Sequence, residues 1–224
     1  MVHFTLFGIP VYIRPSFWVV LAIFGGALSI SSVEDLIYPA LFVIAGFVAI
    51  LSHEMGHALV GRKLGGGQQT IVLELFGGLT SSHGMQLTRG GRALMILAGP
   101  MMTLLLGIIS LGLTWNIVAP VMTSYNLNFW DLAISPFTAA LISPKLFILS
   151  CLIMIGEWWT ILNLLPIYPL DGGQLIAQYI RSPKKVFMTG FITAILIGLL
   201  SFQLFHGYFI PIFMALFAYS NYRE

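Results

Sequence analysis

Long apolar runs separated by short polar segments dominate the chain, and they predict helices that cross a membrane. A helix needs roughly 20 apolar residues to span the hydrocarbon core. Runs that reach or approach this length lie at 16–30, 38–64, 93–115, from 145 onward, 186–205 and 208–222. The pattern therefore predicts about six transmembrane helices.

Two stretches depart from this helical pattern. Between 68 and 82, Ile71 and Leu73 alternate with Thr70, Val72 and Glu74, which is typical of a strand. The Gly77-Gly78 pair that follows favours a turn, so a short re-entrant β-hairpin is expected. The first residues, 3–13, alternate loosely and indicate a short strand or an extended segment.

The fourth apolar run is interrupted. Pro166 and Pro169 lie within residues 163–173, and each proline removes a backbone donor and breaks a helix. We therefore expect a broken fourth helix that exposes polar groups at membrane depth. The predicted fold is an all-α polytopic membrane protein with the short hairpin and this broken helix, forming a single membrane-embedded domain over 1–224.

Composition supports the membrane assignment and excludes other classes. The chain is 58% hydrophobic and 8% charged, whereas soluble domains carry about 25% charged residues. The net charge of +2 is too small to indicate a nucleic-acid partner. Little sequence remains for a separate soluble domain, so the expected surroundings are the lipid bilayer.

The cationic residues predict the orientation of the helices. An N-terminus in the cytoplasm places nine of the ten Lys and Arg residues on the cytoplasmic side and Lys145 alone on the other. The protein is then a multi-pass protein of the cell membrane, with both termini cytoplasmic.

The apolar run 38–64 contains three ionisable residues: His53, Glu54 and His57 form an H-E-x-x-H pattern within it. Residues four apart lie on one face of a helix, so the two imidazoles can bind one metal ion. Glu54 can then act as a general base that activates water. Ionisable side chains inside a spanning helix are costly and mark functional sites.

A catalytic zinc ion usually has three protein ligands. Asp171 is the best third candidate, because it follows the proline-broken stretch near the same membrane face, a setting that Glu74 and Glu157 lack. A helix N-cap is the alternative role for Asp171, and the two roles can coexist. One Zn²⁺ per chain is expected, although the spacing alone also admits other divalent metals.

Two further sites are candidates for substrate binding. Asn163 can donate a hydrogen bond to the substrate backbone or to a developing oxyanion, and the alternative is that it caps the broken helix. The hairpin with Gly77 and Gly78 can offer an open edge to an extended peptide, and the alternative is a hairpin without a ligand role.

Taken together, these motifs resemble the site-2 protease family of intramembrane zinc metalloproteases. The resemblance covers nearly the whole chain. In order, it rests on Gly8-Ile9-Pro10-Val11, His53-Glu54-x-x-His57, Phe76-Gly77-Gly78, Ala98-Gly99-Pro100, and Asn163-x-x-Pro166 through Asp171-Gly172-Gly173.

The resemblance implies zinc ligation by His53, His57 and Asp171, with Glu54 as base and Asn163 as a substrate contact. It also implies that the substrate is a transmembrane segment of another protein. The sequence departs from the family at Thr103, where asparagine is frequent, and no PDZ or CBS domain is visible. A metal-binding membrane transporter without protease activity is the alternative function.

Overall fold

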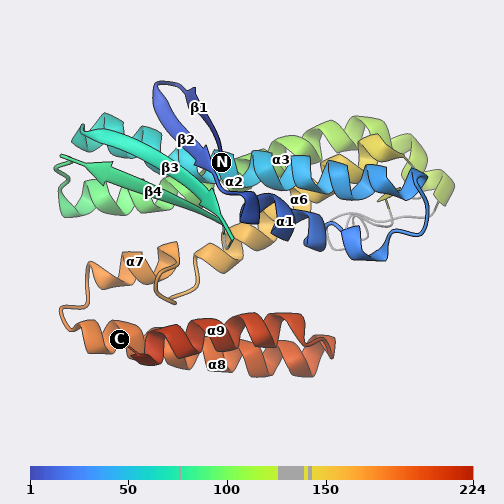
Figure 1. Ribbon diagram of the computed structural model, residues 1–224. Coiled ribbons are helices and arrows are strands. Elements are labelled where there is room, and N and C mark those ends of the chain that lie inside the picture. Colours follow the sequence, from blue (N-terminus) through green and yellow to red (C-terminus); the bar gives the residue numbers. More distant parts are fainter. Residues whose placement is uncertain (76, 126–138, 141–142, 224) are drawn as a thin grey trace. The chain divides into compact units, whose positions relative to one another are not determined.

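The computed structural model describes residues 1–75, 77–125, 139–140 and 143–223 (Figure 1). The chain forms two compact units, Met1–Thr160 and Ile161–Glu224. Phe76 of the predicted hairpin lies outside the described residues, as does most of the connection between the third and fourth predicted spans.

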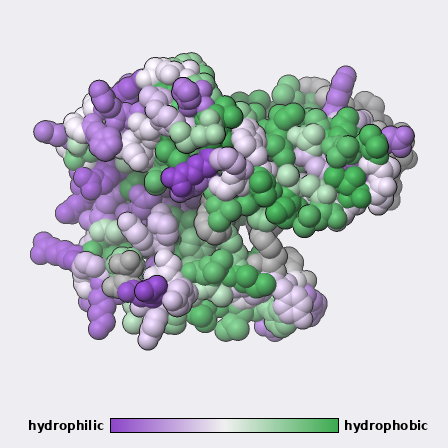
Figure 2. Space-filling view, viewed as in Figure 1, coloured by the Kyte–Doolittle hydropathy of each residue, from purple (hydrophilic) through white to green (hydrophobic). Residues whose placement is uncertain are grey.

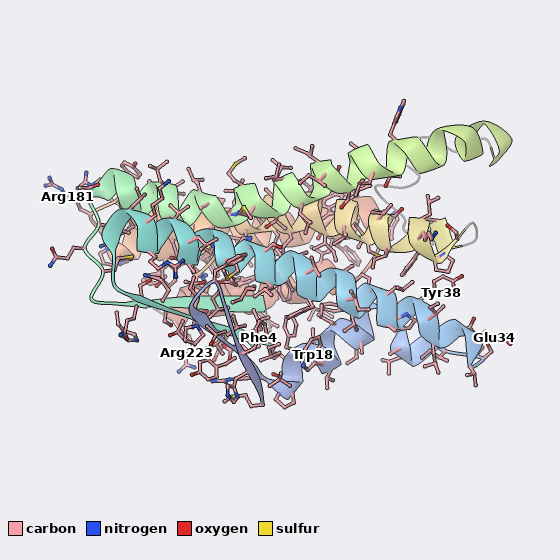
Figure 3. The ribbon with its side chains drawn as sticks, turned by 90° about the horizontal axis from the view of Figure 1, so that it is seen from above. Phe4, Trp18, Glu34, Tyr38, Arg181 and Arg223 are labelled. Carbon is pink, nitrogen blue, oxygen red and sulfur yellow. The ribbon has the colours of Figure 1, made fainter. Side chains whose placement is uncertain are left out.

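Three long helices build the first unit. Their bounds are α2, Ile37–Gly65, α3, Arg89–Tyr125, and α6, Pro144–Asn163, whose last three residues belong to the second unit. The short helices α1 (Pro15–Phe24), η1 (Ala27–Ser29) and η2 (Glu34–Leu36) precede them. Helices α2 and α3 run side by side in opposite directions (Figure 3). The candidate span within α3, Arg89–Trp115, agrees with the predicted span 93–115, although the helix itself continues to Tyr125.

A four-stranded sheet lies at one end of these helices (Figure 1). Its strands follow the order β1 (Val2–Leu6), β2 (Ile9–Ile13), β3 (Gln68–Glu74) and β4 (Gly77–His83). The β1–β2 and β3–β4 pairs are antiparallel, whereas β2 and β3 are parallel. The chain is mostly helical, as predicted, and the predicted hairpin between 68 and 82 forms, but the sheet is larger because β1 and β2 join this hairpin.

Residues 2–13 form a hairpin rather than a single strand. Phe7 and Gly8 make its two-residue turn with φ values of 49° and 76°, the left-handed conformation that tight hairpin turns need. Arg62 fixes the turn by donating a hydrogen bond of 2.8 Å to the carbonyl of Phe7. The hairpin thus reaches the C-terminal end of α2.

The sheet packs on the helices through its alternating apolar positions. Ile9, Val11 and Ile13 of β2 and Ile71 and Leu73 of β3 are buried, as period-two alternation requires for one face of a sheet. They join one hydrophobic core with residues of α1, α2 and α6. Figure 3 shows Phe4 and Trp18 at this core and Glu34 and Tyr38 at the far end of α2.

The second unit contains the predicted break in the fourth helix. Helix α6 ends at Asn163, and the short α7, Asp171–Ala177, begins eight residues later. Helices α8, Pro183–Phe205, and α9, Phe209–Arg223, then pack against each other around Ala194, Met214 and Ala218 (Figure 1). His206 follows α8 in the left-handed conformation and forms the turn toward α9.

Four helices among the described residues are long and apolar enough to cross a membrane. They comprise Glu34–Gly65, Arg89–Trp115, Pro144–Asn163 and Pro183–Leu204. The other two predicted spans correspond to α1, with 10 residues, and α9, with 15. Hydrophobic residues cover the helices of the first unit, whereas hydrophilic residues gather over its sheet (Figure 2).

Helices α3 and α6 approach closely through glycines. A Cβ at Gly156 would lie 2.9 Å from Cα of Gly107 and 3.0 Å from the carbonyl oxygen of Thr103. We expect Gly156→Ala to force the helices apart and to lower the free energy of unfolding by about 1–3 kcal/mol. Thermal unfolding of the detergent-solubilised protein measures this loss.

The matched control is Gly112→Ala on α3, because a Cβ at Gly112 meets no atom within 4 Å. This control is expected to be neutral or stabilising, since alanine favours a helix over glycine. Equal unfolding temperatures for the two variants would contradict close packing at Gly156.

Candidate active site

The two histidines and the glutamate of the H-E-x-x-H pattern lie on α2 and are buried. His53, Glu54 and His57 expose 3%, 5% and 8% of their surface. The imidazole rings of His53 and His57 lie 4.8 Å apart between centroids, and their Nε2 atoms are separated by 3.1 Å. Adjacent turns of one helix thus aim two nitrogens at the same point, as the spacing predicts.

Helix α3 fixes the opposite nitrogen of each ring. Nδ1 of His57 lies 2.8 Å from the carbonyl oxygen of Met95, which can only accept, so this nitrogen carries the hydrogen. Nδ1 of His53 lies 2.9 Å from Oγ1 of Thr103. That hydroxyl donates its own hydrogen to the carbonyl of Gly99 at 3.0 Å, so it accepts from His53. The network therefore places a hydrogen on Nδ1 of both rings.

This tautomer leaves both Nε2 atoms with lone pairs that face each other. A metal ion bound at this point would use both lone pairs. Two nitrogens that bind one tetrahedral zinc ion at about 2.0–2.1 Å are about 3.3 Å apart, close to the observed separation. The pair of imidazoles therefore fits a zinc ion.

Gly99 of α3 keeps this space open. A Cβ at Gly99 would overlap Nε2 of His57 and lie 2.9 Å from Nε2 of His53. Any larger residue would fill the position to which both lone pairs point. The Ala98-Gly99-Pro100 motif thus contributes to the site by the absence of a side chain.

Strand β4 contacts the third member of the motif. Oγ1 of Thr80 donates a hydrogen bond to Oε2 of Glu54 at 2.7 Å, and it lies 3.2 Å from the carbonyl oxygen of Glu54. A Cβ at Gly78 would overlap the Glu54 side chain, and one at Gly77 would lie 2.9 Å from the ring of Trp159. Gly77 and Gly78, predicted as substrate contacts, thus let β4 approach α2 and α6.

The second unit carries the two remaining predicted site residues. Asp171, 6% exposed, is the first residue of α7, and Asn163, 9% exposed, is the last residue of α6. The N-cap position of α7 belongs to Leu170 rather than to Asp171. A carboxylate in the first turn of a helix interacts favourably with the helix dipole.

Backbone contacts shape the segment between Asn163 and Asp171. A Cβ at Gly172 would overlap the carbonyl oxygens of Leu164 and Leu165, so α7 passes directly against the end of α6. Nδ2 of Asn221, on α9, donates a hydrogen bond of 2.6 Å to the carbonyl of Tyr168. This bond satisfies a carbonyl that the broken helix leaves without its helical partner.

The other acidic and histidine candidates have different surroundings. Glu74 pairs with Arg14 at 2.8 Å, and both side chains are solvent-accessible. His83 is exposed at the end of β4. Neither of these two residues resembles a buried metal ligand, and for Glu74 this agrees with the sequence analysis.

Comparison with known proteins identifies the family. Residues 41–205 match peptidase family M50, and this range covers most of the chain and both histidines of the motif. The chain therefore belongs to peptidase family M50, the family of the site-2 proteases.

A similar sequence and a similar solved structure both come from Methanocaldococcus jannaschii. A zinc metalloprotease, MJ0392, is 29% identical over 96% of this chain, and the chain spans 57% of its length. A solved structure titled as a site-2 protease matches 100% of this chain and 94% of its own, with a TM-score of 0.61 and 24% identity. This second likeness supports the fold.

Three contacts of the site have no counterpart among the predicted site residues: Thr80, the carbonyl of Met95, and Thr103. Thr103 differs from the asparagine that is frequent in the family, and the sequence leaves its polar contact in doubt. The structure shows that its hydroxyl keeps a polar contact, and that the partner is His53. A backbone carbonyl such as that of Met95 leaves no signal in a sequence.

The Thr103 hydroxyl supports a prediction on metal binding. Thr103→Val removes the acceptor for His53 Nδ1 while keeping the shape of the side chain, and it leaves a buried N–H unsatisfied. We expect zinc affinity to fall about 10- to 100-fold, as for other hydrogen-bond partners of metal-binding histidines. Competition with a chromogenic chelator measures this affinity, and Thr103→Ser should restore it.

Thr114→Val is the matched control for this variant. Thr114 lies on the same helix, is buried, and also donates to the carbonyl four residues earlier, at Ser110. A similar loss of zinc affinity in both variants would show that the effect comes from helix stability instead of the bond to His53.

Proposed function

We propose that this protein is an intramembrane zinc-dependent endopeptidase that hydrolyses peptide bonds within or near transmembrane segments of other proteins. The observation that carries the proposal is the convergence of two buried imidazole lone pairs beside a buried carboxylate within a membrane-spanning helix. Zinc proteases of this pattern use the same three residue types. The alternative of a metal transporter has no comparable support, since the related proteins reported above are proteases by name.

The residues of the chain would divide the chemistry between them. When bound, zinc supplies Lewis acidity that polarises a peptide carbonyl and acidifies water. His53 and His57 would hold the ion through Nε2, and α3 would keep their rings in the required tautomer. The Glu54 carboxylate would accept a proton from the attacking water and deliver it to the leaving amine.

Asp171 is proposed as the third protein ligand. It is buried, it opens α7 directly after the proline break, and a carboxylate with two imidazoles is a common ligand set for catalytic zinc. A single membrane-embedded domain over 1–224 is part of this proposal. One zinc ion per chain follows from this assignment.

The substrate is proposed to bind as an extended strand. Strand β4 is the edge of the sheet, and among the described residues its outer backbone groups face no further strand. An unwound transmembrane segment can add to such an edge through main-chain hydrogen bonds. Gly77 and Gly78 would border this strand next to Glu54, and Asn163 would donate to the substrate backbone or to the developing oxyanion.

The protein is proposed to lie in the cell membrane with both termini in the cytoplasm. Five cationic residues of the first unit lie at strand or helix ends beside the sheet: Arg14, Arg62, Lys63, Arg89 and Arg92. Lys145 lies at the start of α6. Near the other end of this helix, Thr160 donates a hydrogen bond to the carbonyl of Pro100 on α3. The sheet would face the cytoplasm, the active site would lie in the cytoplasmic half, and α1 and α9 would complete six membrane helices.

The first test of this function concerns Glu54. Glu54→Gln keeps the shape of the side chain but cannot accept a proton at neutral pH, so cleavage should fall by about 10²- to 10⁴-fold. Purified protein in detergent or liposomes, incubated with a model transmembrane substrate, measures this by gel or mass spectrometry. Zinc content should stay at one per chain, and undiminished cleavage by the variant would disprove the assigned base.

The second test concerns the third ligand. Asp171→Ala should lower the zinc stoichiometry well below one and abolish cleavage, since two imidazoles alone bind zinc weakly. Elemental analysis of the purified protein gives the stoichiometry. Glu74→Gln is the control, because that carboxylate pairs with Arg14. Full zinc occupancy in the Asp171 variant would show that Asp171 is not the third ligand.

A further inference from the structure

The side chain of Thr80 connects the edge strand to the proposed catalytic base. Its hydroxyl has one hydrogen to donate, and Oγ1 lies 2.7 Å from Oε2 of Glu54 and 3.2 Å from the carbonyl oxygen of the same residue. The shorter distance identifies the carboxylate as the main acceptor. A hydrogen bond to a carboxylate is about twice as strong as one between neutral groups.

The strand register places Thr80 and Gly78 on the same side of the sheet. Thr80 is opposite Ile71 and Gly78 is opposite Leu73, and both partners on β3 belong to the buried face. Alternate residues of a strand point to one face, so both positions of β4 are directed at α2. Gly78 leaves room for the Glu54 side chain, and Thr80 holds the end of that side chain.

We infer that Thr80 is a positioning residue for Glu54: it binds one carboxylate oxygen and leaves the other for proton transfer. Among the described residues, no hydrogen bond to Oε1 of Glu54 is found, so this oxygen is the one that can meet water. A buried glutamate side chain has three rotatable bonds, and the hydroxyl restricts it to one orientation. This inference rests on the proposed peptidase function.

The arrangement also ties substrate binding to catalysis. The strand that would receive the peptide is the strand that orients the base, so both share one short segment of backbone. A peptide paired with β4 would therefore lie at a fixed position relative to the active carboxylate oxygen. Such positioning affects turnover more than binding, because Thr80 holds the base and not the peptide.

The test compares Thr80→Val, Thr80→Ser and the control Thr70→Val. Thr70 lies on the neighbouring strand β3, on the face opposite Ile71, and among the described residues no hydrogen bond joins its hydroxyl to α2. Thr80→Val should lower kcat about 10- to 100-fold with little change in KM, zinc content or unfolding temperature. Thr80→Ser, which keeps the hydroxyl, should retain most of the activity, and Thr70→Val should resemble the wild type.

A spectroscopic measurement separates this inference from the proposed function. Infrared difference spectra of protein with isotope-labelled glutamate, with Glu54→Gln as reference, isolate the Glu54 carboxylate band. The loss of the Thr80 hydroxyl should shift this band, and Thr70→Val should not. The measurement needs no substrate, so it tests the Thr80 contact even if the wild type cleaves nothing.

An unshifted band, or a kcat of Thr80→Val within twofold of the wild type in a cleaving enzyme, would overturn the positioning role. So would a loss of zinc and stability that accounts for the lost activity. A shifted band in a wild type that cleaves no transmembrane substrate would keep the contact between Thr80 and Glu54 but refute the peptidase function.

Discussion

Two imidazoles within an apolar helix can be stable only if each ring nitrogen has a partner, and this constraint governs the first unit. Helix α3 meets it from one side, with the Met95 carbonyl and the Thr103 hydroxyl at the two Nδ1 atoms. The approach of α3 depends on small residues, because a Cβ at Gly56 would overlap the carbonyl of Ala98. The metal-binding geometry of the two histidines therefore depends on the close packing of α2 and α3.

The sheet contacts the same group of buried polar residues on α2, through Glu54. Its apolar face covers α1 and α2, and its edge strand brings a hydroxyl to Glu54. A sheet edge at this position leaves backbone donors and acceptors next to the buried carboxylate. In a membrane, extended backbone is tolerated only where protein or water surrounds it, and the buried face of this sheet is surrounded by α1, α2 and α6.

Much of this was predictable from local signals, and what was missed depends on distant contacts. The spacing of His53 and His57 within an apolar run specifies their shared face, and Pro166 and Pro169 specify the end of α6. The parallel pairing of Val11 with Ile71 joins segments 60 residues apart, and no local pattern reports it. The partners of the imidazoles were equally hidden, since one is a backbone carbonyl and the other a threonine on a different helix.

The bond between Asn221 and Tyr168 links distant parts of the second unit. The segment before Asp171 receives one of its hydrogen-bond donors from a helix that lies some fifty positions further along the chain. During biosynthesis, this donor is missing until α9 has left the ribosome and packed beside α8. The Tyr168 carbonyl therefore cannot reach its final hydrogen-bonding state before residue 221, close to the end of this sequence, has been synthesised.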